Sequence, residues 1–280
     1  MATYSEQETS RFADAGGIRL HYHDVGEGNP VICLHGGGPG AAGWSNFSQN
    51  IEALAARFRL LLVDMPQFGQ SEKVIVTDEG RLSYTAKAVR AFMDTLGLER
   101  ADFIGNSIGA QSIMKLCLDA PERVGRHVAL GNNAAAPLTF FQPRPPEGIK
   151  MIIDYYDDEG PTREKMRRLI ETLVYDASFL TDEVLEARFQ SSAEPDMVDL
   201  WTNHHPPREE IAERLHEIQA PTLLIWGSED RFSPLDSGLM ELKLLQNAEL
   251  HVFPRCGHWA QVERADAFNT LAAEFLGRKD

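Results

Sequence analysis

The sequence lacks a long hydrophobic run, an apolar N-terminal stretch and an excess of basic residues. No segment approaches the roughly 18 consecutive apolar residues of a membrane-spanning helix, and the N-terminal stretch MATYSEQETSRF is too polar for a signal peptide. The formal net charge of −15 argues against nucleic acid and anionic membranes as partners. We therefore expect a cytoplasmic protein without these partners, in which an anionic substrate needs a local positive group.

Cysteine is also scarce. The chain contains only Cys33, Cys117 and Cys256, an odd and widely spaced set that does not indicate a disulfide framework. Cys256 and His258 offer one metal-ligand pair at most, and no second pair accompanies it. The glycine-rich segments lack the Gly-Lys-Ser/Thr ending of a P-loop and the G-x-G-x-x-G pattern of a dinucleotide site. We therefore expect neither a metal nor a cofactor.

Short apolar runs alternate with segments of helical spacing in two parts of the chain. The runs that predict strands lie within residues 18–25, 30–40, 59–66, 101–106, 125–133, 220–230 and 248–259. Helices are predicted at 44–58, 83–98, 107–121, 235–246 and 266–276. Such alternation is typical of a mostly parallel sheet that is covered by helices on both faces.

The alternation stops between the two parts. Residues 134–205 contain no convincing buried strand, and 144–160, 162–176 and 181–192 have helical patterns separated by Pro, Gly and Asp. Residues 204–210, HHPPREE, predict a linker back to the alternating pattern. The predicted fold is an α/β core formed by 1–133 and 206–280, with a helical lid inserted at 134–205.

The segment GNSIG at 105–109 places a serine between two glycines where a strand becomes a helix. A Gly-x-Ser-x-Gly turn in this position is typical of a nucleophile elbow, in which Ser107 is presented at the carboxyl edge of the sheet. A serine nucleophile needs a base and an orienting acid, in the chain order Ser, Asp or Glu, His. Asp230 and His258 follow two later strands and fit this order. Asp64, which also ends a strand, is the rival acid.

The loop LHGGGPG at 34–40 follows the second predicted strand. Loops of this kind supply one backbone N–H to an oxyanion hole, and the residue after the nucleophile supplies the other. Gly37 and Ile108 are therefore the predicted donors. Glycine at the neighbouring positions, Gly36 and Gly38, lets the backbone approach a bound substrate without interference from a Cβ atom. The alternative interpretation is a glycine-rich turn without a catalytic role.

At this point the sequence resembles a known family. The segments LHGGGPGAAGWSNFSQNI, VDMPQFGQSEK, GNSIGA, YDASFLTDEVLEARF, LLIWGSEDRFSPLD and LHVFPRCGHWAQVE resemble those of the meta-cleavage-product hydrolases, which are α/β-hydrolases. The resemblance covers nearly the whole chain. It implies hydrolysis of a carbon–carbon bond in 2-hydroxy-6-oxo-hexa-2,4-dienoates, the ring-fission products of aromatic catabolism, by ketonisation followed by cleavage.

The resemblance also implies roles for individual residues. Ser107, Asp230 and His258 match the catalytic triad, and Arg188 matches an arginine that grips the dienoate end. Asn46, Asn106 and Trp259 match residues that contact the substrate. From spacing alone, Arg188 would be a solvated helix charge and Trp259 a core residue. The family further implies a homo-oligomer, usually a dimer.

Two departures from the family pattern stand out. Gln67 occupies a position where glycine is usual, and Ala110 replaces a common glycine in the first turn after the serine. The second half of the lid also looks shorter than in steroid-type relatives. The sequence leaves the group at C6 of the substrate open. The candidates for its pocket wall are Phe140, Phe141, Met151, Ile152, Ile153, Tyr155 and Trp201, although helix positions of this kind favour core packing for most of them.

Two other functions remain open at this stage. A carboxylesterase would use the same triad, and a non-catalytic ligand-binding relative would keep the fold without the reaction. Haloalkane dehalogenases and epoxide hydrolases are disfavoured because they carry aspartate at the position of Ser107.

Overall fold

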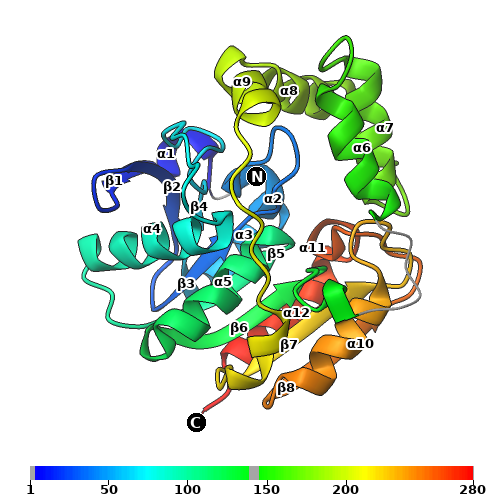
Figure 1. Cartoon of the computed structure of the whole chain (residues 1–280). Helices are drawn as coiled ribbons and strands as arrows, with labels where there is room; N and C mark the ends of the chain where they lie inside the picture. Colours follow the sequence, from blue (N-terminus) through cyan, green and yellow to red (C-terminus); the bar gives the residue numbers. More distant parts are fainter. Residues whose placement is uncertain (1–3, 139–144, 280) are drawn as a thin grey trace.

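An eight-stranded sheet forms the centre of the molecule (Figure 1). The structure is a computed structural model that describes residues 4–138 and 145–279. The strands are β1 Ser10–Asp14, β2 Arg19–Val25, β3 Asn29–Leu34, β4 Phe58–Val63, β5 Ala101–Asn106, β6 Val124–Leu130, β7 Thr222–Gly227 and β8 Ala248–Phe253. They are ordered β1-β2-β4-β3-β5-β6-β7-β8. The pairs from β4 to β8 are parallel, whereas β1 with β2 and β2 with β4 are antiparallel.

The predicted α/β fold with a mostly parallel sheet is confirmed, and one strand was missed. Strands β5 and β7 are buried along their whole length, and the burial of β7 explains why LLIW appears in the sequence as a continuous apolar run. The missed strand β1 is an edge strand whose residues are largely exposed, so it carries no apolar signal. It is defined by its long-range pairing with β2, in which Phe12 lies opposite His21.

Helices cover both faces of the sheet. On one face α4 Arg81–Thr95, α5 Ile108–Asp119 and α10 Leu235–Leu244 contribute to a buried apolar cluster that includes Phe92, Ile113 and Trp226. On the other face α3 Ile51–Ala55 and α12 Ala265–Leu276 bury Leu54 and Phe268. Two such layers bury both faces of the sheet, which holds the ends of its strands in fixed positions.

The helix predicted at 44–58 is interrupted. It consists of α2 Gly43–Phe47, a 3₁₀ turn at Ser48–Asn50 and α3. The buried Asn50 side chain donates to the carbonyl oxygen of Gln261 at 2.8 Å and to Asn269 Oδ1 at 2.9 Å. Both partners lie more than 200 residues further along the chain than Asn50. The local helical spacing at 44–58 therefore gave no sign of the break. The short helix α11 Ala260–Glu263, which supplies Gln261, was also missed.

Among the described residues between β6 and β7, the α-helices are α6 Glu147–Tyr156, α7 Arg163–Leu173, α8 Asp182–Ser192 and α9 Pro195–Asn203. Figure 1 shows them as an arch above the edge of the sheet. The side chains of Thr162 and Thr181 cap α7 and α8. The sequence predicted three of these helices and missed α9, which begins with a proline in its first turn. A third apolar cluster joins residues of α6, α7 and α8 to Phe232 and Trp259.

No helix in the described ranges is long and apolar enough to cross a membrane.

The departure at Gln67 is explained by the backbone. Gln67 has a φ of 78°, a left-handed conformation that favours glycine. Its side chain is buried, and Nε2 donates to the carbonyl oxygen of Val74 at 2.7 Å. The hydrogen bond offsets part of the conformational cost of about 1 kcal/mol, so glutamine is tolerated here.

We expect Gln67→Ala to destabilise the protein by about 1 kcal/mol, because the strain stays while the hydrogen bond is lost. Gln67→Gly should lie within about 0.5 kcal/mol of the wild type, because it loses the hydrogen bond and the strain together. Urea unfolding curves of the three proteins measure both effects. Equal destabilisation by alanine and glycine would contradict this explanation.

Candidate active site

Ser107 lies on a strained turn between β5 and α5. Its φ and ψ are 54° and −121°, which places it in a region that non-glycine residues rarely adopt. A Cβ atom at Gly105 would lie 2.6 Å from the backbone N of Ala110, and one at Gly109 would lie 2.4 Å from the carbonyl oxygen of Leu34. Both glycines are therefore required by close backbone contacts. The turn has the geometry of a nucleophile elbow.

His258 and Asp230 form a buried pair behind the serine. His258 Nδ1 lies 2.8 Å from Asp230 Oδ2, and Asp230 Oδ1 accepts hydrogen bonds from the backbone N–H groups of Phe232 and Ser233, both at 2.8 Å. An ionised carboxylate only accepts, so Nδ1 donates and leaves Nε2 free to take a proton. The Phe232 ring stacks on the imidazole with centroids 5.1 Å apart.

Ser107 and His258 line the same cavity. No hydrogen bond joins them in residues 4–138 and 145–279, and contacts of this kind often tighten only when a substrate binds. The arrangement can perform nucleophilic catalysis, with the imidazole as base and the aspartate as its orienting group.

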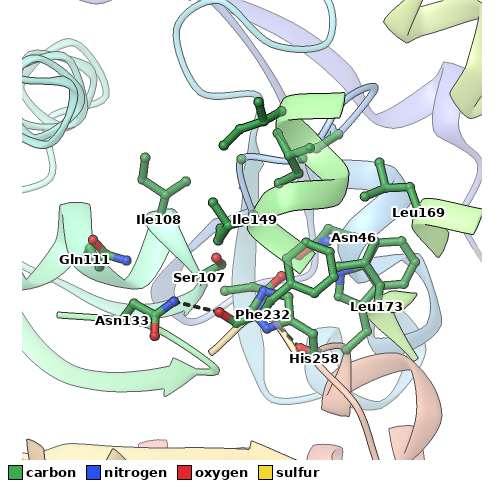
Figure 2. Close-up of a pocket in the computed structure, with 18 of the residues that line it drawn as sticks. Asn46, Ser107, Ile108, Gln111, Asn133, Ile149, Leu169, Leu173, Phe232 and His258 are labelled. Carbon is green, nitrogen blue, oxygen red and sulfur yellow. Dashed lines mark hydrogen bonds between the residues drawn. The ribbon is translucent and has the colours of Figure 1, made fainter. Parts of the chain in front are cut away.

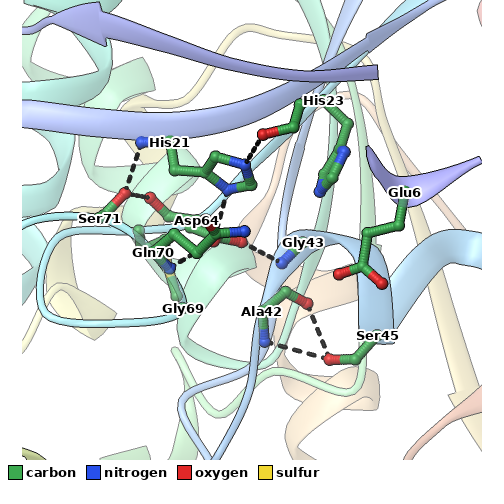
Figure 3. Close-up of polar contacts among 12 residues, drawn as sticks. Glu6, His21, His23, Ala42, Gly43, Ser45, Asp64, Gly69, Gln70 and Ser71 are labelled. Carbon is green, nitrogen blue, oxygen red and sulfur yellow. Dashed lines mark hydrogen bonds and ion pairs between the residues drawn. The ribbon is translucent and has the colours of Figure 1, made fainter. Parts of the chain in front are cut away.

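Asp64, the rival acid, belongs to a different network (Figure 3). Its Oδ2 accepts from His21 Nδ1 at 2.8 Å, and Oδ1 accepts from the backbone N–H of Gly43 at 2.7 Å. His21 Nε2 in turn lies 2.8 Å from Ser10 Oγ. Asp64 and His21 face a second cavity of about 500 Å³, which does not include Ser107. Asp64 thus ties the β4 loop to α2 and to the edge strands.

No group of three or more His, Cys, Asp and Glu side chains within the described ranges could hold a metal ion.

The cavity above Ser107 has a volume of about 370 Å³ and lies between the sheet edge and helices α6–α9 (Figure 2). It brings together nearly every residue that the sequence singled out. Those lining it are Gly36, Gly37, Gly38, Asn46, Asn106, Ser107, Ile108, Arg188, His258 and Trp259. Asp230 stands behind His258 and does not line the cavity.

The two predicted oxyanion donors lie side by side. A Cβ atom on Gly37 would lie 2.8 Å from Ile108 Cγ2, which shows that the glycine loop runs directly over the first residue of α5. Neither backbone N–H has a hydrogen-bond partner among the residues that the structure describes. Two free donors next to a serine can stabilise a developing oxyanion, typically by about 3 kcal/mol each.

Arg188 is buried and has no carboxylate partner in residues 4–138 and 145–279. Its side chain is 8% exposed, Nε has no hydrogen-bond partner, and the guanidinium lies 4.9 Å from the centre of the Trp259 ring. Burial lowers the pKa of Arg188 to about 10, which the nearby Tyr155 and Tyr156 partly oppose. The side chain is therefore still a cation at neutral pH. Asn46 and Asn106 border the same cavity and are 3% and 0% exposed.

The side of the cavity that faces helices α6, α7 and α9 is apolar. It is formed by Ile149, Ile152, Ile153, Leu169, Leu173 and Trp201, with Phe232 from the core. Of the pocket-wall candidates named from the sequence, Ile152, Ile153 and Trp201 line the cavity, whereas Met151 and Tyr155 do not. Tyr155 is instead buried and pairs with Ser192 Oγ at 2.5 Å. Phe140 and Phe141 lie outside the described residues.

Sequence reasoning missed several residues of the site. Gly131, at the end of β6 with a φ of 47°, would carry a Cβ atom 2.9 Å from Asp230 Oδ2, so glycine leaves room for the acid. The position of Gly131 directly after a predicted buried strand was the sequence signal that could have placed it at the site. Arg81, Gln111 and Asn133 also line the cavity. They lie on helix or loop positions that carry no local sequence signature.

Comparisons with known proteins agree with this geometry. A family model described as alpha/beta hydrolase fold matches residues 29–265. The 2-hydroxy-6-oxononadienedioate/2-hydroxy-6-oxononatrienedioate hydrolase of Paraburkholderia phymatum is 42% identical, over 99% of this chain and 98% of the relative. The 2-hydroxy-6-oxo-6-phenylhexa-2,4-dienoate hydrolase of Comamonas testosteroni is 40% identical over the full length of both chains.

A solved structure leads to the same family. The meta-cleavage product hydrolase of Pseudomonas fluorescens superposes with a TM-score of 0.86 at 33% identity, covering 96% of this chain and 98% of that chain. The chain therefore belongs to the meta-cleavage product hydrolases of the α/β-hydrolase family.

The two aspartates make a matched pair of test sites. We expect Asp230→Asn to lower kcat for an aryl ester about a thousandfold or more, because the amide no longer holds the imidazole in its working tautomer. Asp64→Asn should change kcat by less than about tenfold. A tenfold change is about 1.4 kcal/mol of activation free energy, which is no more than one hydrogen bond at the site contributes. It should instead lower the unfolding temperature, because Asp64 holds three groups together.

Steady-state kinetics and differential scanning fluorimetry on both variants measure these effects. A larger kcat loss in Asp64→Asn than in Asp230→Asn would reverse the assignment of the acid.

Proposed function

We propose that the protein hydrolyses the C5–C6 bond of 2-hydroxy-6-oxo-hexa-2,4-dienoates formed by ring fission of aromatic compounds. The observation that carries this proposal is the buried Arg188 in the same cavity as Ser107 and His258. A neutral ester does not require a cation there, whereas a dienoate carboxylate does. The relatives named above are hydrolases of such dienoates or dienedioates.

The site suggests one orientation for the substrate. The dienoate carboxylate binds Arg188, and Asn46 and Asn106 offer amide groups to the same end. The 6-oxo group points to the N–H groups of Gly37 and Ile108, next to Ser107. The C6 substituent then lies against the apolar lid helices α6 and α7.

The chemistry follows from this orientation. Ketonisation moves the enol proton to C5, and His258 removes the proton of Ser107 Oγ as the oxygen adds to C6. When the C5–C6 bond breaks, its electrons pass through the C3–C4 double bond to the 2-oxo group, and protonation of the resulting enolate, which balances the proton that His258 took from Ser107, gives a 2-hydroxypenta-2,4-dienoate. The acyl group left on Ser107 is hydrolysed by water to a carboxylic acid. Binding the dienoate end is thus part of the cleavage step.

Stopped-flow absorbance with a 6-phenyl dienoate tests the proposal. We expect the dienol chromophore to decay in a fast ketonisation phase, followed by appearance of the two products. The rival function is a carboxylesterase with the same triad. Persistence of the chromophore at stoichiometric enzyme, while an aryl ester is turned over efficiently, would favour that rival.

Arg188 separates the two functions directly. Arg188→Met should lower kcat/KM for the dienoate at least about a hundredfold, because a buried charge-assisted contact is lost. It should change kcat/KM for a neutral aryl ester by less than about threefold, a difference of about 0.6 kcal/mol.

Arg163→Met is the matched control for this variant. Arg163 lies on lid helix α7, is exposed and pairs with Glu186 at 2.6 Å, so neither activity should change. Equal losses on the dienoate and the ester in Arg188→Met would contradict the role of Arg188 as an anion grip.

We also propose that residues 134–205 act as a lid on the core formed by 1–133 and 206–280, which the placement of α6–α9 above the cavity supports. We further propose a cytoplasmic location, and the family resemblance supports a homodimer. Light scattering coupled to size-exclusion chromatography measures the oligomeric state.

A further inference from the structure

The second cavity, of about 500 Å³, adjoins the cavity that contains Ser107. Asn46, Arg188 and Trp259 line both cavities, and these three side chains are between 3% and 8% exposed. No hydrogen bond in residues 4–138 and 145–279 fixes the Arg188 guanidinium, so a turn of this side chain breaks none. The two cavities therefore meet at the group that would hold the dienoate end.

The second cavity extends to the surface of the molecule. Its outer wall includes the exposed residues Glu6, Ser45 and Gln70, which Figure 3 shows, and the exposed Ala187 of α8. Its inner wall includes the buried Arg188. A single cavity thus leads from solvent to the guanidinium, and the exposed part of its wall is mainly polar.

The cavity that contains Ser107 has a different opening. Ile153, which is 52% exposed, is the most exposed of the described residues that line it. Ile149 and Ile152 of the same helix line the cavity beside it. After cleavage, the acyl group on Ser107 also extends toward this apolar side. An anion leaving here would have to pass the acyl group and exchange its contact with Arg188 for apolar side chains, which is unfavourable.

The other product of the cleavage is a small anion at the Arg188 end. Its carboxylate can enter the second cavity and keep its ion pair, because the guanidinium borders both cavities. Ser45 and Gln70 then offer polar groups on the way to solvent. The carboxylates of Glu6 and Glu194, both exposed in the outer wall, oppose retention of an anion there. The second cavity is thus suited to passage of an anion and not to its storage.

We propose that the second cavity is the release site for the 2-hydroxypenta-2,4-dienoate product, which leaves past Arg188 without passing the acyl group on Ser107. This inference rests on the proposed function and adds the route of one product. Helix α6 then need not move away from the catalytic serine for this product to leave.

Tryptophan substitutions that fill the second cavity test the route. Ala187→Trp fills it from α8 and Gln70→Trp from the loop after β4, and neither residue lines the cavity that contains Ser107. With excess enzyme, we expect the single-turnover rate of 6-phenyl dienoate cleavage to change by less than about threefold in each variant. Steady-state kcat should fall at least about tenfold, with a burst of about one equivalent of dienoate product, because product release becomes rate-limiting.

Gln190→Trp is the matched control for the variant on α8. Gln190 is exposed on the same helix and lines neither cavity, so kcat should stay within about twofold of the wild type. Turnover of an aryl ester, whose products carry no dienoate group, should change by less than about threefold in Ala187→Trp and Gln70→Trp. Unfolding temperatures show that each variant is folded.

Two outcomes would overturn the release route. One is wild-type kcat in both Ala187→Trp and Gln70→Trp. The other is a loss of single-turnover cleavage as large as the loss of kcat in both variants, because the second cavity would then act in binding or cleavage and not in release. Failure of the wild type to cleave the dienoate would reject the proposed function as well, whereas either of the first two outcomes in an active wild type rejects the release route alone.

Discussion

The active site is organised around Arg188, a buried cation that no carboxylate among the described residues neutralises. Arg188 is 8% exposed and has no carboxylate partner among the described residues. Removing a charge from water without a partner costs several kcal/mol, so the fold holds this group at the expense of stability. The neighbouring residues are shaped around it. A Cβ atom on Gly40 would lie 2.3 Å from the Arg188 carbonyl oxygen, and the Trp259 ring lies beneath the guanidinium.

Arg188 also brings a residue of the inserted helices into the same cavity as Ser107 and His258. Arg188 belongs to α8, whereas the serine, the glycine loop and the histidine belong to the carboxyl ends of β5, β3 and β8. Because parallel strands end at one edge of the sheet, residues from distant parts of the sequence meet there. Ser107 keeps its strained backbone since Gly105 and Gly109 pack against neighbouring backbone. A bound dienoate would complete the site, because its carboxylate supplies the negative charge that pairs with the Arg188 guanidinium.

The sequence predicted those parts of the site that local sequence patterns define. Ser107, Asp230 and His258 each follow an apolar run, and the glycine loop at 34–40 has a recognisable pattern. Arg188 looked like a surface charge by spacing, and only the family resemblance pointed to it. The parts that were missed depend on contacts between distant segments. Strand β1 is specified by β2, the break before α3 by Asn50 contacts with α11 and α12, and Arg81 becomes part of the site only through the packing of α4 and the lid.

A crystal structure of Ser107→Ala with a bound 6-phenyl dienoate tests the central claim most directly. The account predicts that the carboxylate pairs with the Arg188 guanidinium within about 3 Å, and that the 6-oxo oxygen lies at hydrogen-bond distance from the N–H groups of Gly37 and Ile108. A dienoate bound in the reverse direction, with its carboxylate away from Arg188, would contradict it.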